Sequence, residues 1–597
     1  MKKVHILPPD VISKIAAGEV IERPASVIKE LMENALDAET KTIEIHLKEA
    51  GKALIHIKDT GVGIEREDIE TIFLRHSTSK IAKADDLYNI HSLGFRGEAL
   101  YSISSIADIT LRSRTKNQDM GWEIHLRGGK NLDLRPLPMP TIGTEIEVKE
   151  LFFNTPARRK FLKSNTTELN QILNIFISYT LLYPDCRFLL THQEKTLLDL
   201  QPSALISRIA ETLNLDKEHL TEVKQDFPED EVTIRMILGD MNIVRSRRDL
   251  QFIFVNDRPV QNKNITFHIN AVYRLILPPN NFSFFAVYLN LPAEDVDVNI
   301  HPTKREVKIK DEFRVASLLR NLCERALLSQ GQTKQIKTMG TKLQKEFSVE
   351  RALAGTKPLE AAFDEPSSME IWEHSSPGPT QPNPTEQYAF PQTEEFSFTD
   401  KTLVTQKQSH LQKKLFRARY LGQFINKFLL FEVDTSLLVI DQHAAQERIT
   451  FEHFIKQLQK GTVEVQHLLS PYLIKLSPQE IVNWEEAKER LDTIGFATNQ
   501  WDPETIAVHT YPILLKEPEK SVRDLLAGGS VIRCDHETIA RRACRCSIMA
   551  GDSLNPQEAE FVRDQLIKCR DPFTCPHGRP TVVEMTESFL DKQFLRT

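Results

Sequence analysis

The 597-residue sequence predicts a multidomain protein of the mixed α/β (α+β) class. Two observations predict it. Stretches with the period of an amphipathic helix alternate with stretches in which every second residue is apolar, both at 1–332 and at 409–597. The segment between them, 333–408, has neither period and is rich in Pro, Ser, Thr, Gln and Glu, which is typical of a disordered tether. We therefore expect α/β domains at 1–218 and 219–332, and a C-terminal α/β domain with an insertion at about 475–540.

Composition narrows the possible functions. Hydrophobic residues make up 40% of the chain and charged residues 27%, which is ordinary for a globular protein. No apolar run approaches the length of a membrane span, so we expect no membrane partner. The net charge of −7 argues against a general polyanion binder, so any contact with DNA must come from local basic patches. The 7 cysteines are sparse, which favours a reducing compartment and thiol or metal chemistry over a disulfide framework.

The first predicted helix spans Pro24–Asp37. Its apolar side consists of Val27, Ile28, Leu31, Met32 and Ala35. Glu30, Asn34 and Asp37 follow an i, i+4, i+7 pattern and therefore share a different face. Such a polar face is most often only solvated, so by itself it does not establish a site.

Two alternating runs, Ile43–Leu47 and Ala53–Asp59, predict strands after this helix. Asp59 ends the apolar face of the second strand, where a carboxylate costs free energy unless a strong donor meets it. Gly61 and Gly63 in the following turn allow a flat ligand to approach the backbone, although a lone Gly-x-Gly is usually a plain turn.

A glycine-rich turn at Gly94–Leu100 leads into another predicted helix, and free N–H groups at a helix start suit phosphate. Alternation then recurs at Asp108–Arg114 and Gly143–Lys149, which predicts two further strands of the same α/β domain.

In this order, the pieces resemble the ATP site of the GHKL ATPases, the superfamily of gyrase-type topoisomerases, heat-shock chaperones, histidine kinases and MutL proteins. The resemblance implies that Glu30 is the general base that activates water, that Asn34 coordinates Mg2+ and that Asp59 accepts a hydrogen bond from the adenine of ATP. Further nucleotide-binding residues are implied in the base pocket, the lid, the phosphate loop and the fourth motif: Gly61, Gly63, Thr78, Gly94, Phe95, Arg96, Gly97, Glu98, Ala99, Leu100 and Thr144.

A basic segment at Asn154–Lys163 is similar to a signature of the MutL family and not to one of topoisomerases or chaperones. The resemblance implies DNA contacts by Arg158, Arg159 and Lys160, although such charges are usually a solvated helix face. These contacts would be to phosphate, blind to sequence and sensitive to salt.

The second domain would then be the family's transducer domain. Lys304 matches the lysine that reaches the γ-phosphate of ATP, where an ammonium would favour ATP over ADP and join the two domains. Lys263 matches a DNA-contacting position, and Arg245, Arg247 and Arg248 add positive charge nearby in the sequence. From the residues alone, a lysine after a strand is usually only solvated.

The C-terminal part contains a second group of candidate ligands. A buried strand is predicted at 437–440, and Asp441 follows it directly. If a helix begins near residue 442, His443 and Glu447 share one face. Cys544, Cys575 and His577 occur in two later segments, and this mixture of O, N and S donors suits Zn2+ or Mn2+. The residues alone leave metal binding and incidental ion pairing equally open.

These segments resemble the endonuclease motifs of nicking MutL proteins. The resemblance implies that Asp441 and Glu447 are catalytic, and it also implies the metal ligands Asp441, His443, Glu447, Cys544, Cys575 and His577. Cys546 stands where some relatives have a basic residue, so it stays open whether Cys544 or Cys546 is the metal-side thiol.

A short peptide at 466–471 resembles the Gln-x-x-Leu-x-Pro peptides that dock on the sliding clamp. Its clamp-binding residues would be Gln466, Leu468, Leu469 and Pro471. Such a hexapeptide has a high false-positive rate by itself. Its position after the metal motif is where nicking MutL proteins carry their clamp peptide.

The resemblance as a whole implies a bacterial mismatch repair protein, cytoplasmic and associated with the nucleoid. It would be a homodimer that uses ATP and Mg2+ to close around double-stranded DNA, couples MutS to repair, and nicks DNA with Zn2+ or Mn2+ in its C-terminal domain. One alternative is an ATP-switched matchmaker that cuts nothing and holds a structural metal. The other is a type II topoisomerase subunit, for which we find no segment offering a tyrosine nucleophile.

Overall fold

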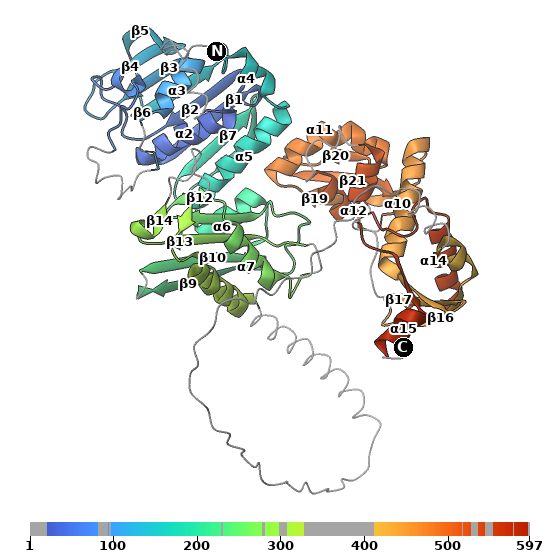
Figure 1. Ribbon diagram of the computed structural model, residues 1–597. Helices are drawn as coiled ribbons and strands as arrows, with labels where there is room; N and C mark the ends of the chain where they lie inside the picture. Colours follow the sequence, from blue (N-terminus) through green and yellow to red (C-terminus); the bar gives the residue numbers. More distant parts are fainter. Residues whose placement is uncertain are drawn as a thin grey trace, which may run out of the picture.

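The computed structural model describes residues 21–80, 93–94, 97–228, 231–277, 281–297, 307–327, 411–515, 517–526, 535–543, 553–576 and 578–594. The described chain forms the expected mixed α/β architecture, with an N-terminal and a C-terminal group of sheets and helices (Figure 1). The predicted tether at 333–408 lies outside the described residues, as do the predicted site residues Phe95, Arg96, Lys304, Cys544 and His577.

An eight-stranded mixed sheet forms the first domain, in the order β5-β4-β3-β6-β2-β1-β7-β8. Its strands are β1 (Thr42–Lys48), β2 (Leu54–Asp59), β3 (Asp108–Arg114), β4 (Gly121–Arg127), β5 (Lys130–Leu137), β6 (Gly143–Lys149), β7 (Arg187–His192) and β8 (Lys195–Leu200). The predicted alternation is confirmed in β1 and β2, where every second side chain is buried. One face of the sheet therefore contributes to the core and the other is polar.

The helix predicted at Pro24–Asp37 is confirmed as α2, with those bounds and proline in its first turn. Its apolar side, including the fully buried Val27 and Ile28, packs into the main core of the domain. The other helices of this domain are α3 (Ala99–Ile106), α4 (Pro156–Phe161), α5 (Asn165–Leu182) and α6 (Leu205–Leu213). Figure 1 shows α2, α3 and α5 over the same face of the sheet, so the polar face of α2 is held near the ends of β2 and β6.

The second sheet has five strands in the order β12-β11-β13-β10-β9. They are β9 (Leu220–Phe227), β10 (Val232–Gly239), β11 (Gln251–Val255), β12 (Arg258–Val260) and β13 (Phe285–Asn290). Helix α7 (Lys263–Tyr273), a helical segment at 312–327 and the small ladder of β14 (Val296–Asp297) and β15 (Lys308–Ile309) accompany it. Short 3-10 turns lie at Glu49–Gly51, Thr71–Phe73, Lys217–His219 and Ala293–Asp295.

Specific hydrogen bonds join these first two domains. Arg258 on β12 is buried and donates to the carbonyl oxygen of Leu93, at 2.8 Å. The hydroxyl of Tyr288 on β13 donates to the carbonyl oxygen of Leu181 at the end of α5, at 3.0 Å. The transducer-like sheet is therefore connected both to the loop that begins at Leu93 and to α5.

The C-terminal sheet is antiparallel, in the order β16-β17-β18-β22. Its elements are β16 (Arg419–Phe424), β17 (Phe428–Val433), β18 (Ser436–Asp441), β22 (Val582–Thr586), α10 (Gln442–Lys460), α14 (Pro556–Ile567) and α15 (Glu587–Gln593). The strand predicted at 437–440 is confirmed as part of β18. Helix α10 begins directly after Asp441, which meets the condition under which His443 and Glu447 share one helix face.

The insertion expected at about 475–540 forms helices over a three-stranded antiparallel sheet, in the order β19-β21-β20. It contains β19 (Val465–Lys475), α11 (Pro478–Ile494), β20 (Thr498–Gln500), β21 (Thr505–Pro512), α12 (Pro518–Leu526) and α13 (His536–Ala543). Its apolar core also includes Phe451 and Phe454 of α10. In the described part of the chain, no helix combines the length and the apolar character needed to cross a membrane.

Helix α11 lies against α5, so the C-terminal half contacts the N-terminal half (Figure 1). The side-chain amide of Asn170 donates to that of Asn483 at 2.7 Å, and Val482 joins the N-terminal core. Lys195 forms an ion pair with Glu485, and Ser246 donates to Asp524. The same face of the insertion therefore makes both apolar and polar contacts with the N-terminal domains.

Candidate functional site

A cavity of about 340 Å3 lies beside α2, between the end of β2 and the segments around Lys80 and Gly94. The structure brings many of the predicted nucleotide-binding residues together in its lining: Glu30, Asn34, Asp59, Gly63, Thr78, Gly94, Gly97, Glu98, Ala99, Leu100 and Thr144. These residues come from segments up to 114 positions apart, as from Glu30 to Thr144. Glu30 and Asn34 lie on the predicted helix face and Asp59 at the predicted strand end. Gly61 lies beside this lining.

Asp59 is the buried carboxylate of the cavity. Its Oδ1 accepts hydrogen bonds from the backbone N–H groups of Gly61, at 2.8 Å, and Thr144, at 3.3 Å. Burial raises the pKa of Asp59 to about 6, although these two N–H groups act to lower it. Because both of these N–H groups donate to Oδ1, the carboxylate is oriented by its own turn and by the start of β6.

Close contacts with neighbouring backbone require glycine at two positions near Asp59. Gly63 has a φ of +78°, and a Cβ there would lie 2.3 Å from the carbonyl oxygen of Arg114. A Cβ on Gly61 would lie 2.7 Å from the carbonyl oxygen of Ala38 at the end of α2. At these two positions, the turn after β2 is packed too closely against its neighbours for a side chain.

Hydroxyl groups complete this end of the cavity. Thr144 Oγ1 lies 2.9 Å from Ser113 Oγ, which is fully buried on β3 and also donates to the carbonyl oxygen of Gly143. The N–H of Ile64 donates to the same Ser113 hydroxyl at 2.9 Å. Sequence reasoning missed Ser113, because nothing in the local pattern of β3 distinguishes this serine from other inward-facing strand residues.

Asp37 is a second residue that sequence reasoning did not assign to the site. Its Oδ1 accepts from the N–H of Leu93 at 2.9 Å, and its Oδ2 accepts from the N–H of Gly94 at 3.1 Å. The ammonium of Lys80 also lies 2.5 Å from Oδ2. The signal was available, because Asp37 continues the helix face that carries Glu30 and Asn34.

Lys80 also meets the predicted Mg2+ ligand. Its Nζ donates to Asn34 Oδ1 at 3.2 Å, so a positive charge already lies at the oxygen where a cation is expected. The amide oxygen of Asn34 and the carboxylate of Asp37 are hard oxygen donors of the kind that Mg2+ prefers, and this donor chemistry fits the ion.

Residues 76–80, which resemble the family's lid, approach Gly97 of the glycine-rich turn closely. Gly97 has a φ of +60°, and a Cβ there would lie 2.4 Å from the carbonyl oxygen of Ser77. Glu98 is the N-cap residue of α3, with His76 Nδ1 at 3.5 Å and Arg75 Nε at 3.8 Å from its Oε1. The first turn of α3 therefore begins at the cavity, as expected for a phosphate-binding helix start.

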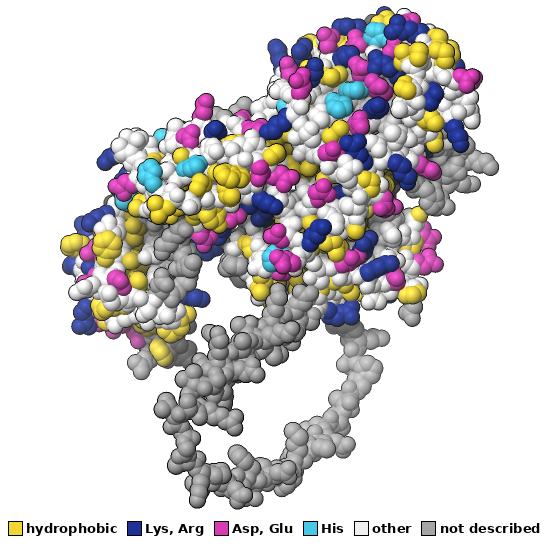
Figure 2. Space-filling model, turned by 180° about the vertical axis from the view of Figure 1, so that it is seen from behind, with side chains coloured by type: hydrophobic (Ala, Val, Ile, Leu, Met, Phe, Trp, Pro, Cys, Tyr) yellow, Lys and Arg dark blue, Asp and Glu magenta, His cyan; other side chains and the backbone are white. Residues whose placement is uncertain are grey.

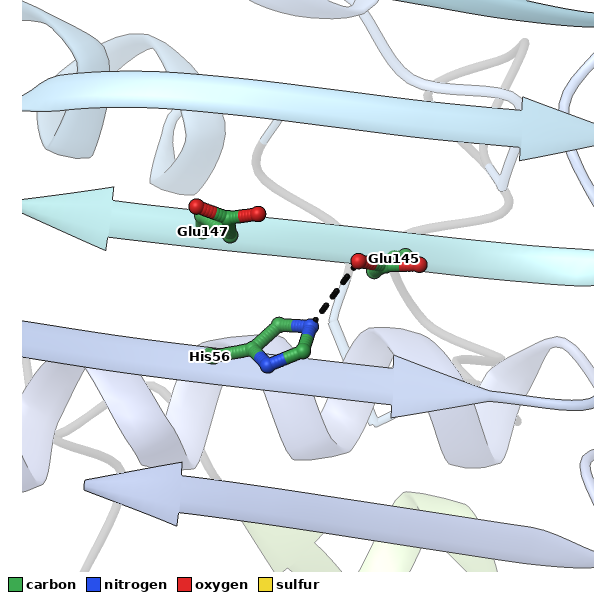
Figure 3. A group of neighbouring side chains, drawn as sticks. All are labelled: His56, Glu145 and Glu147. Carbon is green, nitrogen blue, oxygen red and sulfur yellow. Dashed lines mark hydrogen bonds and ion pairs between the residues drawn. The ribbon is translucent and has the colours of Figure 1, made fainter. Parts of the chain in front are cut away.

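One group of possible metal ligands lies elsewhere, on the polar face of the N-terminal sheet. Figure 3 shows His56 on β2 beside Glu145 and Glu147 on β6. Arg112 donates to Glu145 at 2.9 Å and to Glu147 at 2.7 Å. Burial acts to raise the pKa of Glu147, but hydrogen bonds from Lys149 and Arg112 lower it to about 2. Because these cations already neutralise the carboxylates, we interpret the group as a surface ion-pair network.

The predicted C-terminal ligands begin at the junction of β18 and α10. Asp441 is the N-cap residue of α10 and accepts from the N–H of Ala444 at 2.9 Å. His443 Nε2 lies 3.4 Å from Oε1 of the buried Glu447, as the i, i+4 spacing predicted. The hydrogen bond to Glu447 raises the pKa of His443 more than burial lowers it. Within the described part of the chain, His443 Nδ1 is buried without a hydrogen-bond partner, which is consistent with a ligand position.

Cys575 lies in a tight turn beside this junction. It is 1% exposed, and its N–H donates to the carbonyl oxygen of Arg579 at 2.8 Å. Two hydrogen bonds attach the turn to α10 and β18. Arg448 donates to the carbonyl oxygen of Thr574, and the N–H of Asp441 donates to the carbonyl oxygen of Thr581. Among Asp441, His443, Glu447 and Cys575, no three have donor atoms all within 4.8 Å of one another. The expected set also needs Cys544 and His577, which lie outside the described residues.

The predicted DNA-contacting residues lie on two helices. Arg159 and Lys160 on α4 are exposed, Arg158 donates to the carbonyl oxygen of Ile21 at 3.1 Å, and Lys263 is exposed at the start of α7. On the face drawn in Figure 2, Lys and Arg are interspersed with Asp and Glu. Arg245 is partly buried, and this burial lowers its pKa, although the nearby charge of Glu480 acts to raise it.

The predicted clamp peptide lies in β19. The pairing of β19 with β21 shifts register between His467 and Tyr472, so the intervening residues leave the regular ladder. Gln466, Leu469 and Pro471 are exposed, Leu468 is partly buried, and Leu469 is among the exposed large apolar residues. An accessible peptide of this kind could dock on another protein.

Comparisons with known proteins agree with this arrangement. Three family models match the chain: "Histidine kinase-, DNA gyrase B-, and HSP90-like ATPase" at residues 21–131, "DNA mismatch repair protein, C-terminal domain" at 214–328 and "MutL C terminal dimerisation domain" at 421–554. The DNA mismatch repair protein MutL of Clostridium acetobutylicum is 34% identical to this chain over 633 residues, and the alignment covers 100% of each protein. That of Endomicrobium trichonymphae is 34% identical over 607 residues, covering 99% of this chain and 100% of the relative.

Among solved structures, the Aquifex aeolicus MutL ATPase domain complexed with ADP is 31% identical, with a TM-score of 0.38, and covers 51% of this chain and 98% of that one. The matches to complete relatives span the whole chain at 34% identity, and the three family models follow one another in the order of its domains. The chain therefore belongs to the MutL family of DNA mismatch repair proteins, with a GHKL-type ATPase domain at its amino end and the family's dimerisation domain at its carboxyl end.

Proposed function

We propose that the cavity beside α2 binds and hydrolyses ATP, and that Glu30, Asn34 and Asp59 perform the three roles expected of them. Asp59 accepts from the amino group of adenine, since its carboxylate is buried at the base end of the cavity. Asn34 offers its amide oxygen to Mg2+, which when bound would offset charge on the phosphates. Glu30 takes the proton from the attacking water.

The observation that carries this proposal is that Glu30, Asn34 and Asp59 line one cavity together with the start of α3. The test measures two properties of the Glu30→Ala variant: its rate of ATP hydrolysis and its affinity for a non-hydrolysable ATP analogue. We expect hydrolysis to be lost and binding to be retained, because the general base acts on water and not on the bound nucleotide. Undiminished hydrolysis by Glu30→Ala would remove Glu30 from the mechanism.

We further propose that the dimeric chain cuts one strand of DNA at the β18–α10 junction. Asp441, His443, Glu447 and Cys575 supply O, N and S donors near this junction, and Cys544 and His577 are expected to complete the set. Zn2+ or Mn2+ held there would supply Lewis acidity toward the phosphodiester and a nucleophilic water. What supports this proposal is the donor chemistry and the buried, unpartnered Nδ1 of His443 within the described chain.

Nicking of supercoiled plasmid in the presence of Mn2+ tests this second activity. We expect relaxed circles with the parent chain and intact plasmid with Asp441→Asn. Intact plasmid with the parent chain under every divalent metal would favour the alternative, a matchmaker that holds a structural metal and cuts nothing.

The partners proposed for this activity are double-stranded DNA, MutS, the sliding clamp and a second copy of the chain. The edge strand β16 and the turn after it expose Leu421, Phe424 and Ile425, and such an apolar edge suits contact with another copy. DNA would meet Arg158, Arg159, Lys160 and Lys263 through phosphate alone, which predicts little sequence preference. Because the substrate would be chromosomal DNA, we expect the protein at the bacterial nucleoid.

A further inference from the structure

A row of four side chains extends from Glu30 away from the nucleotide cavity. The ammonium of Lys29 lies 3.1 Å from Glu30 Oε1 and 2.9 Å from Glu33 Oε1. The hydroxyl of Tyr179, on α5, donates to the same Glu33 oxygen. One lysine is therefore shared between the proposed general base and a second carboxylate, and that carboxylate is held by another helix.

The row becomes more buried with distance from the nucleotide cavity. The side chain of Glu30 is 22% exposed and that of Lys29 13%, whereas Glu33 is 3% exposed and Tyr179 1%. Burial and the neighbouring Glu33 raise the pKa of Tyr179 well above its ordinary value, so the phenol remains a hydrogen-bond donor. Burial acts to lower the pKa of Lys29, but the carboxylates of Glu30 and Glu33 outweigh it and raise this pKa, so the lysine remains an ammonium.

Two carboxylates contact the ammonium of Lys29, and Glu33 Oε2 is buried without a hydrogen-bond partner among the described residues. From the neighbouring elements, Tyr179 faces the row from α5, and the positive charge of Arg258 on β12 acts on Tyr179. Asp249, just before β11, lines the same cavity as Lys29 and Tyr179. Without Lys29, Glu30 would lie near the buried carboxylate of Glu33 with less compensating positive charge, which disfavours the ionised form of Glu30.

Lys29 does not line the nucleotide cavity. It lines a different one, together with Tyr179 and residues of β11 and β12 such as Gln251 and Val260. Its effect on a nucleotide must therefore pass through Glu30. The hydrogen bond from Tyr179 to Glu33 already attaches α2 to α5, and it does not require the contact of Lys29 with Glu30.

We propose that Lys29, anchored through Glu33 and Tyr179, is a positioning residue that orients the Glu30 carboxylate and keeps it ionised for its role as general base. This inference rests on the proposed role of Glu30. It also gives a physical reason for the basic residue directly before Glu30 on a helix face that is otherwise buried.

The test is steady-state ATP hydrolysis by the full chain across pH, with Lys29→Met as the variant that keeps side-chain length without charge. We expect kcat near neutral pH to fall about tenfold or more, since part of general-base catalysis is lost. KM should stay within about threefold, because Lys29 does not line the cavity. The acidic limb of the kcat profile should move up by about one pH unit. Lys29→Arg should recover most of kcat.

A double variant separates electrostatics from packing. Glu33→Gln in the Lys29→Met background removes the repelling carboxylate, so kcat should rise relative to Lys29→Met alone. A role limited to packing predicts the opposite, because the double variant loses two native contacts. Thermal unfolding and binding of a non-hydrolysable ATP analogue check that each variant is folded. If Lys29→Met does not fold, Lys29→Gln takes its place in the same comparison.

The kcat of Glu30→Gln, measured in parallel, distinguishes failure of the general-base assignment from failure of the positioning role alone. If Glu30→Gln keeps the parental kcat, the general-base assignment fails, and the positioning role fails with it. If Glu30→Gln is inactive while Lys29→Met keeps the parental kcat and acidic limb, only the positioning role is overturned.

Discussion

The ammonium of Lys80 lies 2.5 Å from the carboxylate of Asp37, so the segment that resembles the family's lid is tied to α2. The same carboxylate receives the backbone N–H groups of Leu93 and Gly94. One side chain at the end of α2 therefore holds both Lys80 and the backbone at Leu93 and Gly94, where the glycine-rich turn begins. Asp37 organises the cavity without any predicted contact to the nucleotide.

Asp37→Asn should weaken binding of a non-hydrolysable ATP analogue by about tenfold, or about 1.4 kcal/mol. The amide can accept from the N–H of Leu93, but its own N–H2 would then face Gly94 and Lys80, which are also donors. Isothermal titration measures the affinity. Glu39→Gln removes an exposed carboxylate two residues away and should leave the affinity unchanged; equal affinities for both variants would contradict the anchoring role.

Asp59 should make nucleotide binding dependent on pH near 6. Its raised pKa, about 6, means that the carboxylate becomes protonated as the pH falls through this value and loses its charge as an acceptor for adenine. Affinity for an ATP analogue should therefore fall between pH 7.5 and 5.5 more steeply than in Asp59→Asn. The variant supplies the baseline for titration of the phosphates themselves, and parallel slopes would exclude this role for Asp59.

The same residue predicts an effect on stability with a definite sign. The folded carboxyl binds its proton more tightly than the unfolded one, so its contribution to the unfolding free energy is lost as pH rises from about 4 to about 6. Asp59→Asn keeps an oxygen for the N–H groups of Gly61 and Thr144 and removes the buried charge. It should stabilise the free protein near neutral pH by up to about 3 kcal/mol, and hardly at all at pH 4. Urea unfolding at both pH values measures the difference.

Gly63→Ala should disrupt the turn after β2. The added Cβ would lie 2.3 Å from the carbonyl oxygen of Arg114, in a backbone conformation that L residues rarely adopt. We expect a loss of about 2 kcal/mol or more of unfolding free energy, together with loss of nucleotide binding. Gly422→Ala is the matched control, because a Cβ at Gly422 meets nothing within 4 Å. Similar melting temperatures for the two variants would contradict the close approach.

Local periodicity was enough to predict α2 with its bounds and the strand that ends in Asp59. Each of these depends on a short, regular pattern of burial. Ser113 and Tyr179 could not be predicted this way, because their partners Thr144 and Glu33 lie 31 and 146 positions away in the sequence. The chemistry of the cavity was therefore readable from single segments, whereas the contacts that orient it arise only when those segments pack.

Leu469 should contribute to binding of a sliding clamp. It is exposed in the irregular part of β19 and contributes nothing to the core of the insertion, so Leu469→Ala should leave the melting temperature unchanged. Affinity for a purified clamp should fall about tenfold, since an exposed apolar anchor of a docking peptide is removed. Surface plasmon resonance with immobilised clamp measures it. Trp501→Ala, another exposed apolar residue of the insertion, should bind like the parent.

Contact between α11 and α5 should be detectable in the full chain. The side chains of Asn170 and Asn483 are joined by a hydrogen bond of 2.7 Å, so cysteines at these positions should react together with a short bis-maleimide. Asn170→Cys paired with Glu489→Cys, an exposed position six residues further along α11, should cross-link poorly. The cross-linked peptides are identified by mass spectrometry, which separates them from products of the native cysteines. Because the contact lies within one chain, the yield should not depend on protein concentration. Equal yields from the two pairs would contradict the contact, and with it the physical connection from α11 through α5 to the helix that carries Glu30.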